Sequence, residues 1–159
     1  VYSVIKENIY KNIFRGFFMS SILERAEAKA RIQADIDNLN ASLAIWEPDR
    51  KEAMEKKRRY IAMKTEISSA QSKLRTAKAQ LSRASFILNN YSGFSIKKFA
   101  GEVSEKMTSI DGVVSRLSGV SGEASRQIKK LEVKIEQLDN WIKNAKVSIA
   151  QLQQQFYML

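Results

Sequence analysis

The side chains that could do chemistry in this chain are carboxylates, serines and basic groups, because the sequence contains no cysteine and no histidine. Thiolate metal sites, disulfides and cysteine nucleophiles are therefore excluded within it. A Ser-His-Asp triad and histidine acid–base catalysis are excluded as well. The carboxylates are spread along the chain, with no pair at a spacing that suggests catalysis. We therefore expect a protein that is not an enzyme and that has no catalytic residue, metal or cofactor.

The densest run of basic residues is Lys56–Arg59, in the segment KEAMEKKRRY. Such a run could bind phosphates or anionic lipid, or it could be a solvated helix face. Consecutive residues point around a helix and do not form one patch, and only Tyr60 is an adjacent aromatic for base stacking. The net charge of +10 at pH 7 favours acidic partners in general but argues for no nucleic acid in particular.

Two long segments carry apolar residues in alternating steps of three and four, which predicts helices with a coiled-coil stripe. They run from about Ser21 to Leu88 and from about Ile96 to Phe156. A single proline and six glycines disfavour a fold of strands and turns. No run of about 18 uncharged apolar residues predicts a transmembrane segment. We predict an all-α fold, a long antiparallel helical hairpin that resembles a coiled coil.

The segment NNYSGFSIKKF separates the two arms and predicts the tip of the hairpin near residues 89–95. Asn89 and Asn90 can end a helix in a left-handed cap, and Gly93 tolerates a positive φ. Ser95 suits the N-cap of the next helix.

An antiparallel register centred on Ser92 makes the levels of the two arms predictable. Trp46 should fall close to Leu138 and Trp141, so that the two tryptophans meet at one level. The other expected pairs are Leu81–Val103, Ile67–Leu117 and Ile32–Leu152.

Pro48 interrupts the first arm and predicts either a kink or a break at Glu47–Pro48. With a break, residues 19–46 could turn back and cover the hairpin.

The run GVVSRLSGVSGEAS raises a similar question in the second arm, because its glycines each cost about 1 kcal/mol inside a helix. Either the helix breaks near Ser118–Ser121, or Gly119 and Gly122 belong to a small-residue strip on which a partner helix packs closely. The stripe also slips in phase between Val120 and Ile128, which would locally unwind a supercoil.

Residues 1–18, VYSVIKENIYKNIFRGFF, precede Met19 and are rich in residues that AT-rich DNA encodes by chance. We interpret them as a translated leader or a disordered segment, with an amphipathic anchor or a packed helix as alternatives. Residues 19–159 then form a single helical-hairpin domain.

The tip also carries a family resemblance. Tyr91, Gly93 and the following Phe99 resemble the W-x-G turn of the WXG superfamily, with tyrosine in place of the usual tryptophan. The segments KLRTAKAQL and LEVKIEQLDNWI resemble the longer relatives encoded beside LXG-domain toxins, and the resemblance covers roughly Tyr60 to Ile142.

This resemblance implies a targeting factor or chaperone that packs on the helical targeting domain of a toxin, with or without a second small helical protein. Such a protein is cytoplasmic before export and is secreted by a type VII system. The family's export signal places an acidic residue four positions after an aromatic one, whereas the residue four positions after Trp141 is Ala145. The signal therefore resides in a partner, or this chain is not exported.

A binding role also follows from the hairpin itself, since two helices bury only one seam and leave other apolar residues in water. A self-associating structural coiled-coil rod or scaffold, such as a homodimer, is the alternative, and nucleic-acid or membrane binding is a third class. The candidate partner-binding residues are Phe86, Ile87, Val114, Gly119, Gly122, Val133 and Trp141.

Overall fold

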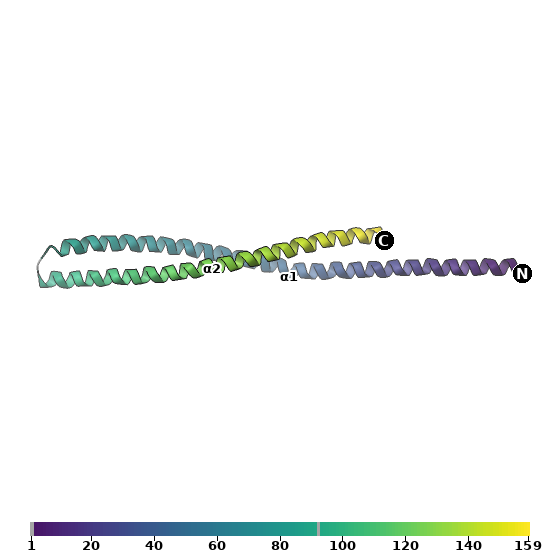
Figure 1. Cartoon of the computed structure of the whole chain (residues 1–159), viewed down its shortest axis with the longest axis horizontal. Coiled ribbons are helices and arrows are strands. Elements are labelled where there is room, and N and C mark those ends of the chain that lie inside the picture. Colours follow the sequence, from purple (N-terminus) through teal and green to yellow (C-terminus); the bar gives the residue numbers. More distant parts are fainter. Residues whose placement is uncertain (1, 92) are drawn as a thin grey trace. The chain divides into compact units, whose positions relative to one another are not determined.

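The computed structural model describes residues 2–91 and 93–159, with side chains from residue 21 onward. These residues form two long helices, α1 (Tyr2–Leu88) and α2 (Phe94–Met158), and no strand occurs among them (Figure 1). The helices pack against each other in opposite directions, which confirms the predicted all-α helical hairpin. The side chains of residues 1–20 lie outside the described part, and the leader at residues 1–18 stays a prediction.

The chain forms two compact units, each built from a segment of α1 and a segment of α2. Unit 1 comprises Val1–Arg50 and Gln137–Leu159. Unit 2 is Lys51–Glu136 and contains the turn between the helices.

The core of unit 2 follows a seven-residue repeat on both helices. Its fully buried residues are Ala53 and Ile67 on α1 and Val103 and Ala124 on α2. Residues seven positions away along the same faces are half-buried. The resulting columns are Ala53, Tyr60, Ile67, Leu74, Leu81 and Leu88 on α1, and Ile96, Val103, Ile110, Leu117, Ala124 and Leu131 on α2.

Unit 1 contains the aromatic pair that the sequence predicts. The ring centroids of Trp46 and Trp141 are 5.6 Å apart and the ring planes are tilted by 45°. Ile36, Leu138 and Ala145 are buried in the same unit. The expected meeting of the two tryptophans is therefore confirmed, and with it the register in unit 1.

Helix α1 passes through Pro48 without interruption, so of the two alternatives at Glu47–Pro48, a kink or a break, the break is wrong. A segment that turns back at this point to cover the hairpin is wrong for the same reason. Proline inside a helix removes a backbone hydrogen bond and costs about 3 kcal/mol. Buried residues lie on α1 both before and after the proline, at Ile36 and Ala53, and their packing offsets this cost.

Helix α2 is also continuous, so the alternative break near Ser118–Ser121 is wrong. The predicted slip in phase is wrong as well. Ser121 is half-buried and occupies the seam position between Leu117 and Ala124, whereas Val120 is exposed. A serine thus fills one position of a repeat that continues unchanged.

The turn between the helices is at the predicted place, but its caps differ from the prediction. No described residue has a positive φ, so neither Asn89, Asn90 nor Gly93 adopts a left-handed conformation. Instead, backbone bonds from Asn90 N to Ile87 O and from Tyr91 N to Leu88 O, both 3.1 Å, tighten the end of α1.

The N-cap of α2 is Gly93 and not Ser95. The backbone N–H of Lys97 donates to the Gly93 carbonyl at 3.0 Å, and α2 begins at Phe94. Glycine is an accepted N-cap residue, so the serine two positions later is not needed for this role.

Candidate protein-binding surfaces

Three cross-helix contacts in unit 2 lie fourteen and then seven residues apart on each helix, so they fall on one seven-residue repeat, and they fix how α1 faces α2. We call them the polar ladder. They are Lys57 Nζ to Glu132 Oε1 at 2.9 Å, Gln71 Nε2 to Ser118 Oγ at 2.8 Å, and Lys78 Nζ to Asp111 Oδ1 and Oδ2 at 2.7 and 2.5 Å. In unit 1, Arg50 pairs with Asp139 at the same spacing.

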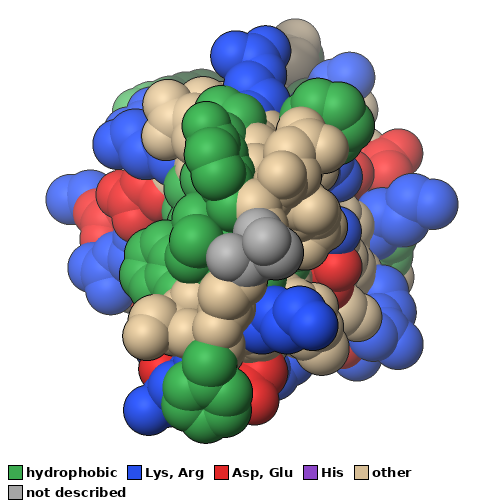
Figure 2. Space-filling model, turned by 90° about the vertical axis from the view of Figure 1, so that its left-hand side faces the viewer, with side chains coloured by type: hydrophobic (Ala, Val, Ile, Leu, Met, Phe, Trp, Pro, Cys, Tyr) green, Lys and Arg blue, Asp and Glu red, His purple; other side chains and the backbone are tan. Residues whose placement is uncertain are grey.

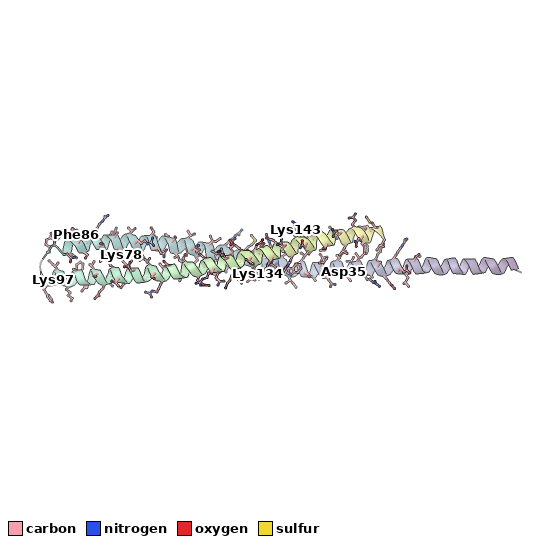
Figure 3. All side chains as sticks on the ribbon, viewed as in Figure 1. Asp35, Lys78, Phe86, Lys97, Lys134 and Lys143 are labelled. Carbon is pink, nitrogen blue, oxygen red and sulfur yellow. The ribbon has the colours of Figure 1, made fainter. Side chains whose placement is uncertain are left out.

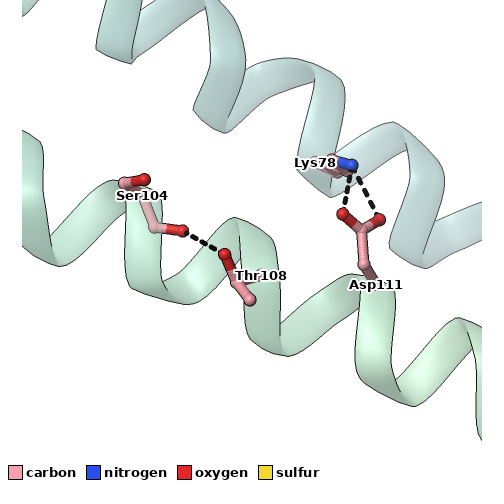
Figure 4. A network of polar contacts seen from close by, with 4 residues as sticks. All are labelled: Lys78, Ser104, Thr108 and Asp111. Atoms are coloured by element: carbon pink, nitrogen blue, oxygen red, sulfur yellow. Dashed lines mark hydrogen bonds and ion pairs between the residues drawn. The ribbon is translucent and has the colours of Figure 1, made fainter.

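Figure 4 shows the Lys78–Asp111 contact beside a second kind of bond, in which Thr108 Oγ1 donates to the Ser104 carbonyl one turn earlier at 3.2 Å. The Gln71 amide also reaches across to the Val114 carbonyl at 3.3 Å, in a part-buried position. The ladder therefore tethers α1 to both the side chains and the backbone of α2.

The ladder has a direction, because every donor lies on α1 and every acceptor lies on α2. Lys78–Asp111 lies between the levels of the expected pairs Leu81–Val103 and Ile67–Leu117, in agreement with the predicted register. Sequence reasoning missed this feature. The signal was present, since the donors and the acceptors are each spaced by multiples of seven residues, but it becomes visible only when the two arms are read in opposite directions.

At the tip, all three residues of the predicted turn motif are exposed. Tyr91, Gly93 and Phe99 make no buried core there. A Cβ on Gly93 would meet Ile96 Cδ1 at 3.7 Å, which is ordinary contact. The turn therefore does not require glycine for space or for a positive φ.

The candidate residues Phe86 and Ile87 lie beside this motif, in the last turn of α1, and are exposed. Figure 3 places Phe86 and Lys97 at this end of the two helices. The structure thus brings the turn motif and two of the partner-binding candidates together.

The candidates in the middle of α2 divide between the seam and the outside. Val114 is half-buried in the seam, so its assignment to the outer surface is wrong. Its neighbour Val113 is exposed in its place. Gly119 and Gly122 are exposed, and a Cβ on either would meet no atom within 4 Å.

An outward surface on α2 therefore combines two valines with two glycines. Val113 and Val120 are 37% and 47% exposed and lie seven residues apart. Gly112 and Gly119 each precede one of these valines, so they lie on the neighbouring side of the helix, about 100° around its axis, and space around both is open. We call these four residues the Val113–Val120 face.

The remaining candidates are exposed in their own units. Val133 is exposed in unit 2. Trp141 in unit 1 is 49% exposed although it packs on Trp46, so about half of its surface is available to a partner.

The basic run is divided between contacts within the hairpin and solvent. Lys56 pairs with Glu52 one turn earlier at 2.5 Å, and Lys57 belongs to the polar ladder. Arg58 and Arg59 are exposed. This division agrees with the interpretation of the run as a helix face and not as one cationic patch.

The pKa values of three ionisable groups on the helix surfaces are shifted by neighbours on the same helix. A hydrogen bond and the charge of Lys56 lower the pKa of Glu52, and the same contact raises the pKa of Lys56. The side-chain hydrogen bond from Gln127, with the charge of Arg126, lowers the pKa of Glu123. All three shifts favour the charged forms, as expected for i,i+3 and i,i+4 pairs on a helix.

Among the described side chains, no group of three or more carboxylates is arranged to hold a metal ion. In the same part of the chain, no helix is long and apolar enough to cross a membrane.

Comparisons with protein-family models, with curated proteins and with solved structures give no match for this chain. The surfaces described above therefore carry the functional argument.

Proposed function

We propose that this chain is a non-catalytic binding protein whose Val113–Val120 face packs against a helix of another protein. The observation that carries the proposal is the pairing of exposed valines with open glycines on an unbroken helix. Glycines let a second backbone approach closely, and the valines supply apolar area at that point. Each valine contributes about 1.5–3 kcal/mol when it is fully buried.

The fold supports this proposal because it does not need the face for its own stability. The core of unit 2 is formed by other columns of α1 and α2. Three glycines in α2, Gly112, Gly119 and Gly122, each cost about 1 kcal/mol relative to alanine, and none is required by space within the hairpin. A partner helix on this face would give the glycines a role.

The resemblance of Tyr91, Gly93 and Phe99 to the W-x-G turn suggests which partner this is. We propose the helical targeting domain of an LXG toxin, which the chain would accompany from the cytoplasm to a type VII secretion system. The half-exposed Trp141 and the exposed Val133 would extend the contact.

Co-expression with the product of the neighbouring large gene tests this function. We expect a stoichiometric complex that resists high salt and that is lost in the double variant V113D/V120D. The matched control is T65D/S72D, which adds the same two charges at the same seven-residue spacing on exposed positions of α1. Equal loss in both double variants, or a salt-sensitive complex, would argue against the Val113–Val120 face.

A self-associating coiled-coil scaffold is the second candidate, because the same exposed valines could pair two copies of the chain. A stable homodimer, with no complex with the neighbouring gene product, would favour it. Analytical ultracentrifugation of the wild type and of V113D/V120D separates the two functions.

A further inference from the structure

The tip of the hairpin carries a cluster of apolar side chains that are exposed among the described residues of unit 2. Phe94 is 87% exposed and Phe86 is 72% exposed. Ile87, Tyr91 and Phe99 are exposed beside them. Figure 2 looks onto this end of the molecule, where hydrophobic side chains gather, with lysine and arginine side chains and fewer aspartate and glutamate side chains around them. We call these five residues the aromatic tip.

Basic residues predominate in the sequence around the aromatic tip. The segment Ile67–Gly101 contains no aspartate or glutamate. Of its basic residues, Lys78 is engaged by Asp111, whereas Arg83, Lys97 and Lys98 are exposed and closest in sequence to the turn. The basic residues of this segment are Lys73, Arg75, Lys78, Arg83, Lys97 and Lys98. The nearest carboxylates along α2 are Glu102 and Glu105, farther from the turn.

We propose that the aromatic tip docks on an anionic lipid surface. Aromatic rings favour the headgroup level of a bilayer, where an apolar body meets a polar boundary. Lysines that flank such rings can bury their stems while their ammonium groups reach anionic headgroups. The proposal uses no residue of the Val113–Val120 face and does not rest on the function proposed above.

The arrangement of the side chains favours a lipid surface over a protein groove. The five residues come from three short segments, which are the end of α1, the turn and the start of α2. They form a protruding end, whereas a helix that binds a groove presents a strip of residues three and four positions apart. Ile87 adds aliphatic surface, which favours lipid over the base stacking that aromatic rings offer to nucleic acid.

Sedimentation of the full chain with vesicles tests the proposal. The vesicles are phosphatidylcholine alone or phosphatidylcholine mixed with phosphatidylglycerol, and binding is expected only to the mixed vesicles. Each lysine near an anionic surface contributes about fivefold to binding, so K97Q/K98Q should weaken it about 25-fold. Removal of the most exposed ring in F94S should weaken it at least about tenfold.

Matched controls separate the tip from general charge and apolar surface. K129Q/K130Q removes two adjacent exposed lysines elsewhere on α2, and I61S removes an exposed apolar side chain of α1. Both are expected to bind like the wild type. Since all substituted positions are exposed, the thermal midpoint followed by circular dichroism should stay the same in every variant.

Insertion itself is measured with F94W and brominated lipids. The native tryptophans, Trp46 and Trp141, belong to unit 1 and not to the tip. Quenching should therefore appear in F94W and not in the wild type.

Three results would overturn the proposal. They are the absence of binding to the mixed vesicles, equal losses in the tip and control variants, and tip variants that bind vesicles normally but lose a protein or nucleic-acid partner.

Discussion

Lys64 marks a step of the polar ladder at which no cross-helix hydrogen bond or ion pair forms among the described residues. It lies seven residues from both Lys57 and Gln71, and Ser125 is the α2 residue at the matching step between Ser118 and Glu132. Lys64 and Ser125 are both half-buried, and Ser125 Oγ donates to the Ser121 carbonyl on its own helix at 3.0 Å. We predict that Ser125→Glu supplies the missing carboxylate and stabilises unit 2.

The expected gain follows from the exposure of the pair. Ion pairs at the surface contribute about 0.2–1 kcal/mol, and partial burial of both positions places this pair in the upper half of that range. For a chain of this size, about 1 kcal/mol corresponds to an increase of about 2–4 °C in the thermal midpoint. Glutamate also has a slightly higher helix propensity than serine, so the single variant alone does not isolate the ion pair.

A double-mutant cycle isolates the contribution of the ion pair. Ser125→Glu is combined with Lys64→Met, which keeps most of the apolar stem and removes the charge, and urea unfolding is followed by circular dichroism. We expect a coupling free energy of about 0.5–1 kcal/mol that falls in about 1 M salt. Ser115→Glu is the control, since Ser115 is exposed on α2 and lies outside the ladder.

A coupling energy indistinguishable from zero would refute the reasoning, and so would a Ser125→Glu variant less stable than the wild type. Either result would mean that the seven-residue recurrence of donors and acceptors does not set the facing of the helices.

Three further predictions follow from the helices and the turn. Pro48→Ala should stabilise the chain by up to about 3 kcal/mol in urea unfolding, because Pro48 is exposed inside α1 and only its backbone effect is removed. Gly93→Ala should leave the thermal midpoint unchanged or slightly raised, since Ile96 leaves room for a Cβ and no positive φ is needed. A large decrease in the thermal midpoint would show that the turn depends on glycine after all. Because the pKa values of Glu52 and Glu123 are lowered in the folded chain, their contribution to stability is present above the ordinary glutamate value of 4.5 and is lost as pH falls through the lowered values. Thermal unfolding of Glu52→Gln and Glu123→Gln against pH measures this, and the difference from wild type should vanish at the acidic end.

The sequence was sufficient to predict the all-α hairpin, because the apolar spacing and the absence of strand signals both indicate helix along the two arms. The polar segment at residues 89–95 located the turn, and the pairing of Trp46 with Trp141 followed from its position. These inferences need only the period of a helix and the direction of the chain.

Whether the helices break at Pro48 or at the glycines could not be predicted, because the answer depends on two opposing energies, the local cost of these residues and the packing around them. Pro48 and the glycines of α2 have local costs that a sequence shows directly. The packing that offsets them comes from residues that are distant along the chain or lie on the other helix. Propensity therefore left a break open at both places, and tertiary packing prevents it.

The candidate surface was predicted in part for a related reason. Val114 and Val113 are adjacent and chemically identical, and only the phase of the repeat decides which one faces the seam. Ser121 occupies a seam position, and a polar residue there made the repeat look displaced. The error in phase exchanged the inner and the outer valine.

The burial pattern separates residues that hold the hairpin from residues that are free to bind. The buried columns and the polar ladder account for the pairing of α1 with α2 without any contribution from Phe94. Phe94 is 87% exposed and gains little burial energy in the folded chain, so its substitution should cost binding and not stability. Val120 is 47% exposed, so its substitution should cost some stability as well as binding, but less than substitution of the buried Ile67, which should cost about 2–5 kcal/mol as Ile67→Ala. Variants that bind poorly but unfold like the wild type are therefore the diagnostic class for this protein, and a variant of Phe94 that unfolds early would show that this side chain belongs to the core after all.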